Sequence, residues 1–411
     1  MSLHPWQSFW PGINSRLKKP LFQGQLNWLQ RIDCLLCRSI HSMKSFSRRI
    51  HDLYANLRSA VRLYPKIESS PKNSSGVTVI PLIEAGSEEV PCELEARFFN
   101  QTATSALMRW PAVNFHHIRN ATVVGDQASI FTPDGKWLRV CPSFDLLPLS
   151  KVRQPISIGA KRVTTPLFHL SGRDHENHGH FLFQHMPRWM AAQKKMQELN
   201  PQFKILVAKG HLKWQSRYLL KTGVTQDQII ECSDGTTRCN DLFYVPQLRG
   251  VQDCLSRPQD YRTMNDYFHR PHAKTGPSLF LSRKDAPNRY LLDEPAAIAE
   301  AEKVFGSVRV IQLSKTPLDE QIDLVSKAPV IISPLGQALA VSLFARNSVI
   351  INLDGGPGPD AWGDAFRNVA NICGNQGISL YSGSTRTPDG SFTFPPQVLN
   401  QMLEKVKKLI Q

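Results

Sequence analysis

The amino-acid sequence predicts an α/β protein with two Rossmann-like halves, preceded by a basic amphipathic helical extension. Beyond residue 203, short strand-like runs alternate with helical patterns. The strand-like runs are apolar without interruption, which is typical of parallel strands in sheets that are covered on both faces. Basic residues are spread unevenly. Residues 1–75 hold twelve Lys and Arg against three Asp and Glu, so +9 of the formal net charge of +15 lies in this segment.

The first 67 residues predict the helical extension. Apolar residues between Leu21 and Leu63 recur at spacings of three and four, as in one amphipathic helix or a pair of helices. The polar face carries the cations Arg31, Arg38, Lys44, Arg48, Arg49, Arg58 and Arg62. Two interpretations are equally favoured: residues 1–63 contact an anionic membrane surface, or they pack on the protein body or a coiled-coil partner. Nucleic acid is disfavoured, because the rest of the chain has no basic patch interleaved with aromatic residues.

A linker and a β-rich segment are expected next. Residues 68–76 have the Ser, Pro and Gly content of a linker. Short strands are expected at 77–83, 121–124, 129–132 and 137–140. The turn Pro133-Asp134-Gly135 predicts a hairpin between the last two strands. We expect residues 77–272 to form an N-terminal domain that begins with strands and continues as α/β.

The alternating pattern contains two series that meet near residues 271–277. The first series has expected strands at 165–170, 203–208, 228–232 and 237–245 and expected helices at 211–222 and 257–270. The second has expected strands at 278–282, 308–313, 330–333, 349–353 and 378–381, and expected helices at 294–305, 317–328, 337–345, 361–373 and from Pro395-Pro396 onward. We expect the second domain to span 273–411, with a ligand-binding cleft at the carboxyl ends of the strands.

Composition excludes several classes of protein. Over 411 residues, 41% are hydrophobic and 20% are charged, so the chain has the composition of a globular protein and disorder is disfavoured. No apolar run is long enough for a membrane span, and the N-terminus lacks the order of a secretory signal. Eight scattered cysteines include one close pair, Cys34 and Cys37, without a second pair at zinc-finger distance. The sequence predicts a cytoplasmic protein, either free or peripheral on the inner face of the plasma membrane.

The stretch from His175 to Arg188 concentrates reactive side chains. Its fourteen positions include His175, Glu176, His178, His180, His185 and Arg188. The stretch follows an expected strand and a Ser-Gly break, and its later part has helical spacing. Histidines at such a strand-to-helix junction can face a cleft.

Three interpretations of these histidines are open. His178-x-His180 and His175-x-x-His178 resemble metal-ligand spacings, and imidazole suits zinc or iron. However, no cysteine pair is nearby and no His-Glu-x-x-His helix is present. The structural alternative is surface histidines or hydrogen-bonded core histidines. We favour a catalytic or substrate-orienting cluster, because histidine titrates near neutral pH and can deprotonate a hydroxyl.

A second candidate site lies in the C-terminal domain. The run Ser-Pro-Leu-Gly-Gln-Ala-Leu at 333–339 predicts a strand, a tight glycine turn and a helix start, whose free backbone N–H groups suit a phosphate. Arg283 and Lys284 follow the first strand of the same domain, and Arg289 comes six residues after Arg283. Cations at that edge would hold a diphosphate; the alternative is that they lie on a surface loop and bind no ligand. The domain lacks Gly-x-Gly-x-x-Gly, the P-loop and Asp-x-Asp, which favours a nucleotide diphosphate held without metal.

Three ordered blocks carry a family resemblance. The first is Asn-His-Gly-His-Phe-Leu-Phe-Gln-His-Met-Pro-Arg at 177–188. The second is Ser282-Arg283 with Arg289, followed by Asp293-Glu294. The third combines Glu320-Gln321 with the runs at 333–339, 343–345 and 349–353. In this order, over residues 165–385, the blocks resemble glycosyltransferase family 61.

The resemblance implies a GT-B fold, in which two Rossmann-like domains face a cleft. It also implies inverting transfer from a nucleotide-sugar donor to a glycan or lipid-linked acceptor, without an essential metal or another cofactor. Bacterial members are often linked to capsular and other surface polysaccharides. Gln184, Leu335 and Asn352 depart from the family pattern, where many members carry a carboxylate, His and Glu, respectively. A catalytically degenerate protein that binds glycans or nucleotides is therefore the alternative hypothesis.

The predicted site residues follow from these matches. His180 matches the family histidine and is the first choice for the catalytic base, with His185 and Glu176 as the next candidates. The residues predicted to bind substrate are Asn177, Arg188, Ser282, Arg283, Arg289, Glu320, Gly336 and Gln337. The β-rich segment and the first α/β series would bind the acceptor. The second series would bind the donor diphosphate.

Overall fold

The structure is a computed structural model, and it describes residues 67–68, 75–125, 129–138, 160–172, 175, 177–207, 209, 212–232, 235–246, 256–356 and 361–411. The predicted helical extension and most of the predicted linker lie outside these residues. Residues 68–411 form one compact unit. None of the described helices is both long and apolar enough to cross a membrane.

The first sheet is mixed. After β1 (Ile67–Glu68), its strands are β2 (Val77–Ile83), β5 (Val113–Val124), β6 (Ser129–Phe131), β7 (Trp137–Leu138), β8 (Lys161–Val163), β9 (Leu167–His169), β10 (Lys204–Val207), β11 (Ile229–Glu231) and β12 (Thr236–Tyr244). The strand order is β7-β6-β5-β12-β9-β10-β11, with β2 on β5 and β8 on β12. Strands β12, β9, β10 and β11 are parallel, but β12 pairs with β5 in antiparallel register. The four strands of the first α/β series are therefore parallel, as predicted, and the antiparallel pairing begins where this series meets the β-rich segment.

Two local predictions in the first sheet are confirmed. Strand β2 has the expected bounds, and β6 and β7 form the expected hairpin. The backbone N–H of Thr132 donates to the carbonyl of Lys136 at 2.9 Å across the turn. Gly135 has φ +77°, a left-handed conformation that costs glycine little because it has no Cβ.

Helices cover one face of the parallel part of this sheet. They are the π-helix η4 (Phe181–His185), α5 (Met186–Leu199), α6 (Leu212–Lys221) and α7 (Pro258–Phe268), whose apolar residues share a core with Phe168, Ile205 and Phe243 of the strands. Two shorter helices complete this half, namely α4 (His178–His180) and the 3-10 helix η5 (Gln226–Gln228). On the opposite face, the described buried residues such as Leu167, Leu206 and Leu242 form a separate cluster.

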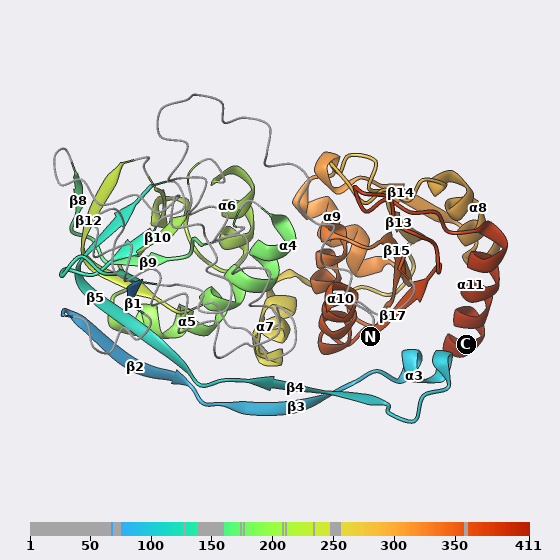
Figure 1. Cartoon of the computed structure of the whole chain (residues 1–411), viewed down its shortest axis with the longest axis horizontal. Helices are drawn as coiled ribbons and strands as arrows, with labels where there is room; N and C mark the ends of the chain where they lie inside the picture. Colours follow the sequence, from blue (N-terminus) through green and yellow to red (C-terminus); the bar gives the residue numbers. More distant parts are fainter. Residues whose placement is uncertain are drawn as a thin grey trace, which may run out of the picture. The chain divides into compact units, whose positions relative to one another are not determined.

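The second sheet is parallel throughout, as predicted. Its strands are β13 (Ser278–Leu281), β14 (Val308–Ile311), β15 (Val330–Pro334), β16 (Val349–Asp354) and β17 (Gln376–Tyr381), in the order β14-β13-β15-β16-β17. Its helices are α8 (Glu294–Phe305), η6 (Leu313–Lys315), α9 (Leu318–Lys327), η7 (Gln337–Phe344), α10 (Ala361–Ile372) and α11 (Pro396–Ile410). Helices α8 and α11 cover one face, whereas α9, α10 and η7 cover the other (Figure 1). The expected helix at 337–345 is a 3-10 helix, which an apolar run of eight residues does not distinguish from an α-helix.

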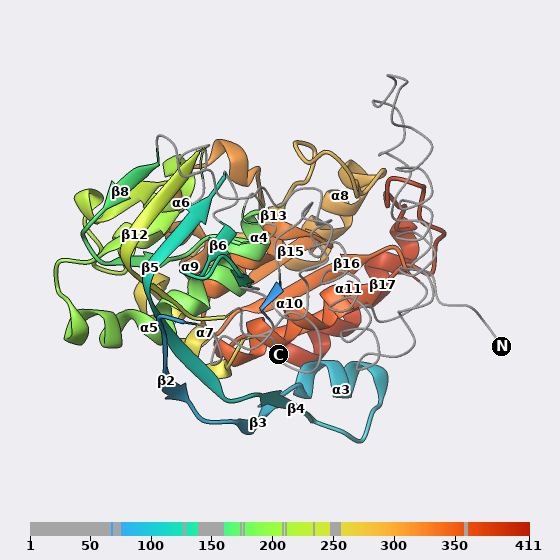
Figure 2. The ribbon, with the colours of Figure 1, turned by 60° about the vertical axis from the view of Figure 1, so that its left-hand side comes forward.

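A ribbon that the sequence did not predict joins the two sheets. Strands β3 (Gly86–Pro91) and β4 (Ser105–Trp110) pair in antiparallel register, and α3 (Glu93–Phe99) lies at the end of the ribbon. Figures 1 and 2 both show α3 beside α11 and β17. Leu94 and Phe98 of α3 are buried in the core of the second sheet. Glu95 forms a buried ion pair with Arg367 at 2.6 Å.

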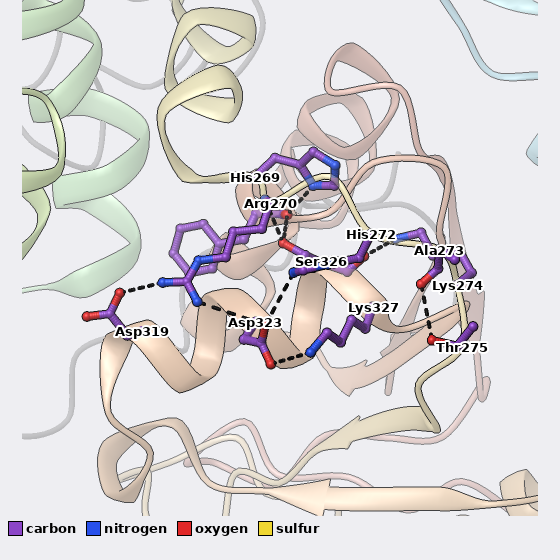
Figure 3. Close-up of polar contacts among 11 residues, drawn as sticks. His269, Arg270, His272, Ala273, Lys274, Thr275, Asp319, Asp323, Ser326 and Lys327 are labelled. Carbon is purple, nitrogen blue, oxygen red and sulfur yellow. Dashed lines mark hydrogen bonds and ion pairs between the residues drawn. The ribbon is translucent and has the colours of Figure 1, made fainter.

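The segment that leads from α7 to β13 follows helix α9 (Figure 3). The guanidinium of Arg270 lies 2.7 Å from the carboxylate of Asp319 and 3.9 Å from that of Asp323. The ammonium of Lys274 donates to the carbonyl of Ser326 at 2.6 Å. Burial lowers the pKa of Lys274 to about 8. This segment is therefore held along α9 by charged and polar contacts.

Candidate active site

A cavity of about 640 Å³ lies where strands β13 and β15 end. These strands are neighbours in the sheet, yet α8 follows β13 onto one face and η7 follows β15 onto the other. Ligands of open α/β sheets bind at such a switch point, beyond the carboxyl ends of the strands. The opposite wall of the cavity comes from the first series, through residues 177–180 and helix α6.

The structure brings seven of the predicted site residues to this cavity. They are Asn177, His180, Ser282, Arg283, Arg289, Gly336 and Gln337. His185 and Arg188 are fully buried and do not line the cavity. Glu320 is exposed and forms an ion pair with Arg309 at 2.8 Å. Glu176 lies outside the described residues.

The π-helix η4 lies just before a proline. Pro187 has no N–H, so it cannot donate to the carbonyl of Phe183 four residues earlier. The hydroxyl of Tyr261, on α7, donates to that carbonyl instead at 2.8 Å. The backbone N–H of Met186 bonds to Phe181, five residues earlier, which closes the wider π turn. Such π-bulges often occur at functional sites.

His180 is held from two directions. Asn177 caps the helix, and its side-chain oxygen accepts the backbone N–H of His180 at 3.1 Å. The ring nitrogen Nδ1 of His180 lies 2.9 Å from Oε1 of Gln184, one turn further along. Gln184 is only 3% exposed, whereas His180 is half-buried and reaches the cavity. Asn177 therefore positions the backbone, and Gln184 positions the ring.

His178 joins the two walls of the cavity. Its Nε2 lies 2.6 Å from the hydroxyl of Tyr218 on α6. Burial lowers the pKa of His178 to about 4, and a hydrogen bond to the backbone of Gln337 opposes this shift. The ring is therefore neutral near pH 7 and serves as a hydrogen-bonding group. Its contacts tie α4 to α6 and to the first residue of η7.

Sequence reasoning missed the contribution of helix α6. Trp214, Arg217 and Tyr218 line the cavity. Their spacing of three and four residues places them on one face of the helix. This shared helix face was the only feature of the sequence that could have indicated a binding role for the three residues. Two aromatic residues with one cation are equally typical of a helix that simply packs on the protein.

Arg188 is fully buried and bonds to backbone carbonyls of neighbouring segments. Its guanidinium donates to the carbonyls of Val245 at 2.6 Å, Ser171 at 2.9 Å and His169 at 3.0 Å. It also contacts Nδ1 of His185 at 3.3 Å. These bonds tie helix α5 to the ends of strands β9 and β12, behind the residues that line the cavity.

Arg283 lies directly over Gly336. A Cβ at position 336 would meet the Nη1 atom of Arg283 at 2.0 Å, so only glycine allows this approach. The guanidinium donates to the carbonyls of Asn288 at 3.2 Å and Arg289 at 3.4 Å, and it forms no ion pair with a described carboxylate. Burial and the charge of Arg289 lower the pKa of Arg283 to about 10. Two neighbouring cations at this strand end are suited to an anionic ligand.

Ser282 is oriented away from such a ligand by a buried acid. Its hydroxyl donates to Glu294 at 2.8 Å, at the start of α8. The other carboxylate oxygen of Glu294 accepts the backbone N–H of Arg283 at 3.3 Å. Ser282 and Glu294 thus hold the turn that places Arg283. Within the described part of the chain, no three His, Cys, Asp or Glu side chains gather as metal ligands.

Comparison with known proteins places this geometry in a family. The family model described as Glycosyltransferase 61 matches residues 178–351, which include residues from both walls of the cavity. The match ends one residue before Asn352. A search of curated proteins found no match. The resemblance to this family is confirmed: residues 178–351 form a glycosyltransferase family 61 region, and the protein is a glycosyltransferase, which acts on a donor sugar and an acceptor substrate.

Proposed function

We propose that the protein is an inverting glycosyltransferase of the GT-B type. In this proposal, residues 273–411 bind the diphosphate of a nucleotide-sugar donor, and residues 77–272 bind a glycan or lipid-linked acceptor for surface polysaccharide biosynthesis. One observation carries the proposal. The buried guanidinium of Arg283 lies on Gly336 at the strand switch point, across the same cavity from His180.

The reaction needs a base on one side and a cationic site on the other. Nε2 of His180 takes the proton from an acceptor hydroxyl, whose oxygen attacks the anomeric carbon of the donor sugar. The bond between that carbon and the phosphate oxygen breaks, and the electron pair leaves with the diphosphate. Arg283, Arg289 and backbone N–H groups at the start of η7 stabilise the developing negative charge. No metal ion takes part in this scheme.

Arg283→Ala tests the donor site. We expect it to weaken binding of UDP and GDP by about tenfold to hundredfold, because a charge-assisted hydrogen bond to phosphate contributes roughly 1.5–3 kcal/mol. Binding of the parent nucleosides should change far less. Titration calorimetry measures both. Gly336→Ala should have a similar effect, since the added Cβ displaces the guanidinium of Arg283.

Arg309→Ala is the matched control, because Arg309 is exposed and pairs with Glu320 away from the cavity. Equal nucleotide binding by Arg283→Ala and Arg309→Ala would contradict the donor site. Activity should also survive EDTA. Loss of activity in EDTA, with recovery on adding magnesium, manganese or zinc, would support the metal interpretation of the histidines instead. Nucleotide binding without turnover for any sugar in a donor panel would favour the degenerate binder.

We also propose that residues 1–63 hold the enzyme on the anionic inner face of the plasma membrane. The support is the sequence pattern alone, in which apolar residues recur at spacings of three and four and seven cations fall on the predicted polar face. Each cation near such a surface contributes about 1 kcal/mol. Binding to phosphatidylglycerol vesicles should therefore fall steeply with salt and be lost when residues 1–63 are deleted. Unfolding of the truncated chain, or binding that ignores salt and lipid charge, would identify the segment as a packing element.

A further inference from the structure

We propose that Gln184 is a positioning residue that sets the tautomer of His180, leaving Nε2 of that ring as the proton acceptor. This inference rests on the proposed function of His180 as the base. Gln184 then contributes to the reaction without touching substrate. In this role its amide orients the ring without adding a negative charge beside it.

The geometry carries the inference. His180 and Gln184 are four residues apart across the start of the π-helix, so their side chains lie on the same side of it. The distance between Nδ1 and Oε1 is 2.9 Å, that of a good hydrogen bond. Gln184 is 3% exposed, so packing holds the amide in place. The backbone of His180 is held independently by the Asn177 cap.

This arrangement selects one tautomer. The amide oxygen of Gln184 can only accept a hydrogen bond, so Nδ1 of His180 carries the proton and donates it. A neutral imidazole has one proton, and Nε2 therefore carries the lone pair. A carboxylate at position 184 would orient the ring equally well, but its charge would also stabilise the imidazolium. The amide gives orientation without this stabilisation.

Other titratable groups share the cavity lining with His180. They are His178, Arg217, Tyr218, Arg283, Asp285 and Arg289. The neutral His178 and the buried Tyr218 contribute no charge near pH 7, because burial lowers the pKa of His178 to about 4 and raises that of Tyr218. Arg217, Arg283, Arg289 and Asp285 are the charged groups among the described residues that line the cavity, so this lining carries both signs of charge. A carboxylate at position 184 would add one negative charge to this set of charges.

Nitrogen NMR of the full-length protein without substrate tests the tautomer. With ¹⁵N-histidine, we expect Nδ1 of His180 to be protonated and Nε2 to give the signal of an unprotonated nitrogen. Gln184→Leu should produce a mixture of tautomers. A wild-type ring protonated at Nε2 would overturn the proposal, since it would mean that the amide nitrogen donates to Nδ1.

Kinetics separate positioning from folding. Gln184→Leu should lower kcat by about 100-fold, the lower end of the range for a general base, with little change in KM. Gln184→Glu should retain much of the wild-type kcat, but the acidic limb of its pH profile should lie at higher pH than that of the wild type. Gln193→Leu and Gln193→Glu are matched controls, because Gln193 donates to the carbonyl of Thr222 and does not line the cavity. An unmoved pH profile in Gln184→Glu, or equal effects at both positions, would overturn the proposal.

The outcomes also separate this inference from the proposed function. If Gln184→Leu fails to fold, the wild-type tautomer and the Gln184→Glu profile still decide. Loss of activity in His180→Ala with the opposite tautomer in the wild type would leave the enzyme assignment intact and remove only the role of Gln184. The expected tautomer in a protein that turns over no donor would instead contradict the proposed function.

Discussion

His180→Ala is expected to lower turnover by about two to four orders of magnitude, the range for loss of a general base. The physical reason is that His180, the first choice for the base, lines the cavity across from Arg283. Donor binding should change little, because the diphosphate would contact the second sheet. Turnover and calorimetric binding of the nucleoside diphosphate, measured on the same variant, give the required comparison.

His185→Ala and His117→Ala are the informative companions. His185 is buried behind the cavity, and His117 pairs with Asp241 on the first sheet at 2.7 Å. We expect neither ring to accept the acceptor proton. Near-normal turnover in His180→Ala, with activity lost in His185→Ala or Glu176→Ala, would move the base to another residue. Unchanged turnover in His180→Ala, His185→Ala and Glu176→Ala would remove the catalytic interpretation of the histidines.

Arg188→Met is expected to lower the free energy of unfolding by at least about 3 kcal/mol. It leaves three buried backbone carbonyls without their donor, and each unsatisfied buried group costs roughly 1–3 kcal/mol. Methionine retains much of the side-chain volume, so a cavity contributes little. Urea denaturation, followed by circular dichroism, measures the change.

Arg309→Met is the control for this experiment, because exposed ion pairs contribute roughly 0–1 kcal/mol. The comparison also decides between two roles for Arg188, which the sequence predicted as a substrate ligand. A stable Arg188→Met variant that had lost substrate binding would favour the ligand role. We expect the opposite pattern, with lost stability and donor binding retained in the fraction that folds.

The sequence by itself determined most elements from residue 203 onward. Strand β16 and helix α8 have unbroken apolar runs or helical spacing, and their observed bounds lie within two residues of those expected. Such elements are encoded locally, because burial of a strand or of one helix face requires a pattern visible in a few residues. The donor-side candidates Arg283 and Gly336 were found for the same reason, as both directly follow strands of one parallel sheet.

Only the tertiary structure decided the rest. Strand β3 reads Gly-Ser-Glu-Glu-Val-Pro and has no strong strand signal, and α3 is stabilised by burial of Leu94 and Phe98 in a core far away in the sequence. Arg188 and Glu320 matched the family blocks equally well, yet one is buried against backbone carbonyls and the other is paired on the surface. The environment of Gln184 likewise depends on Pro187, Tyr261 and the π-helix together. Local patterns show which residues can carry chemistry, but long-range packing determines which of them reach the cavity.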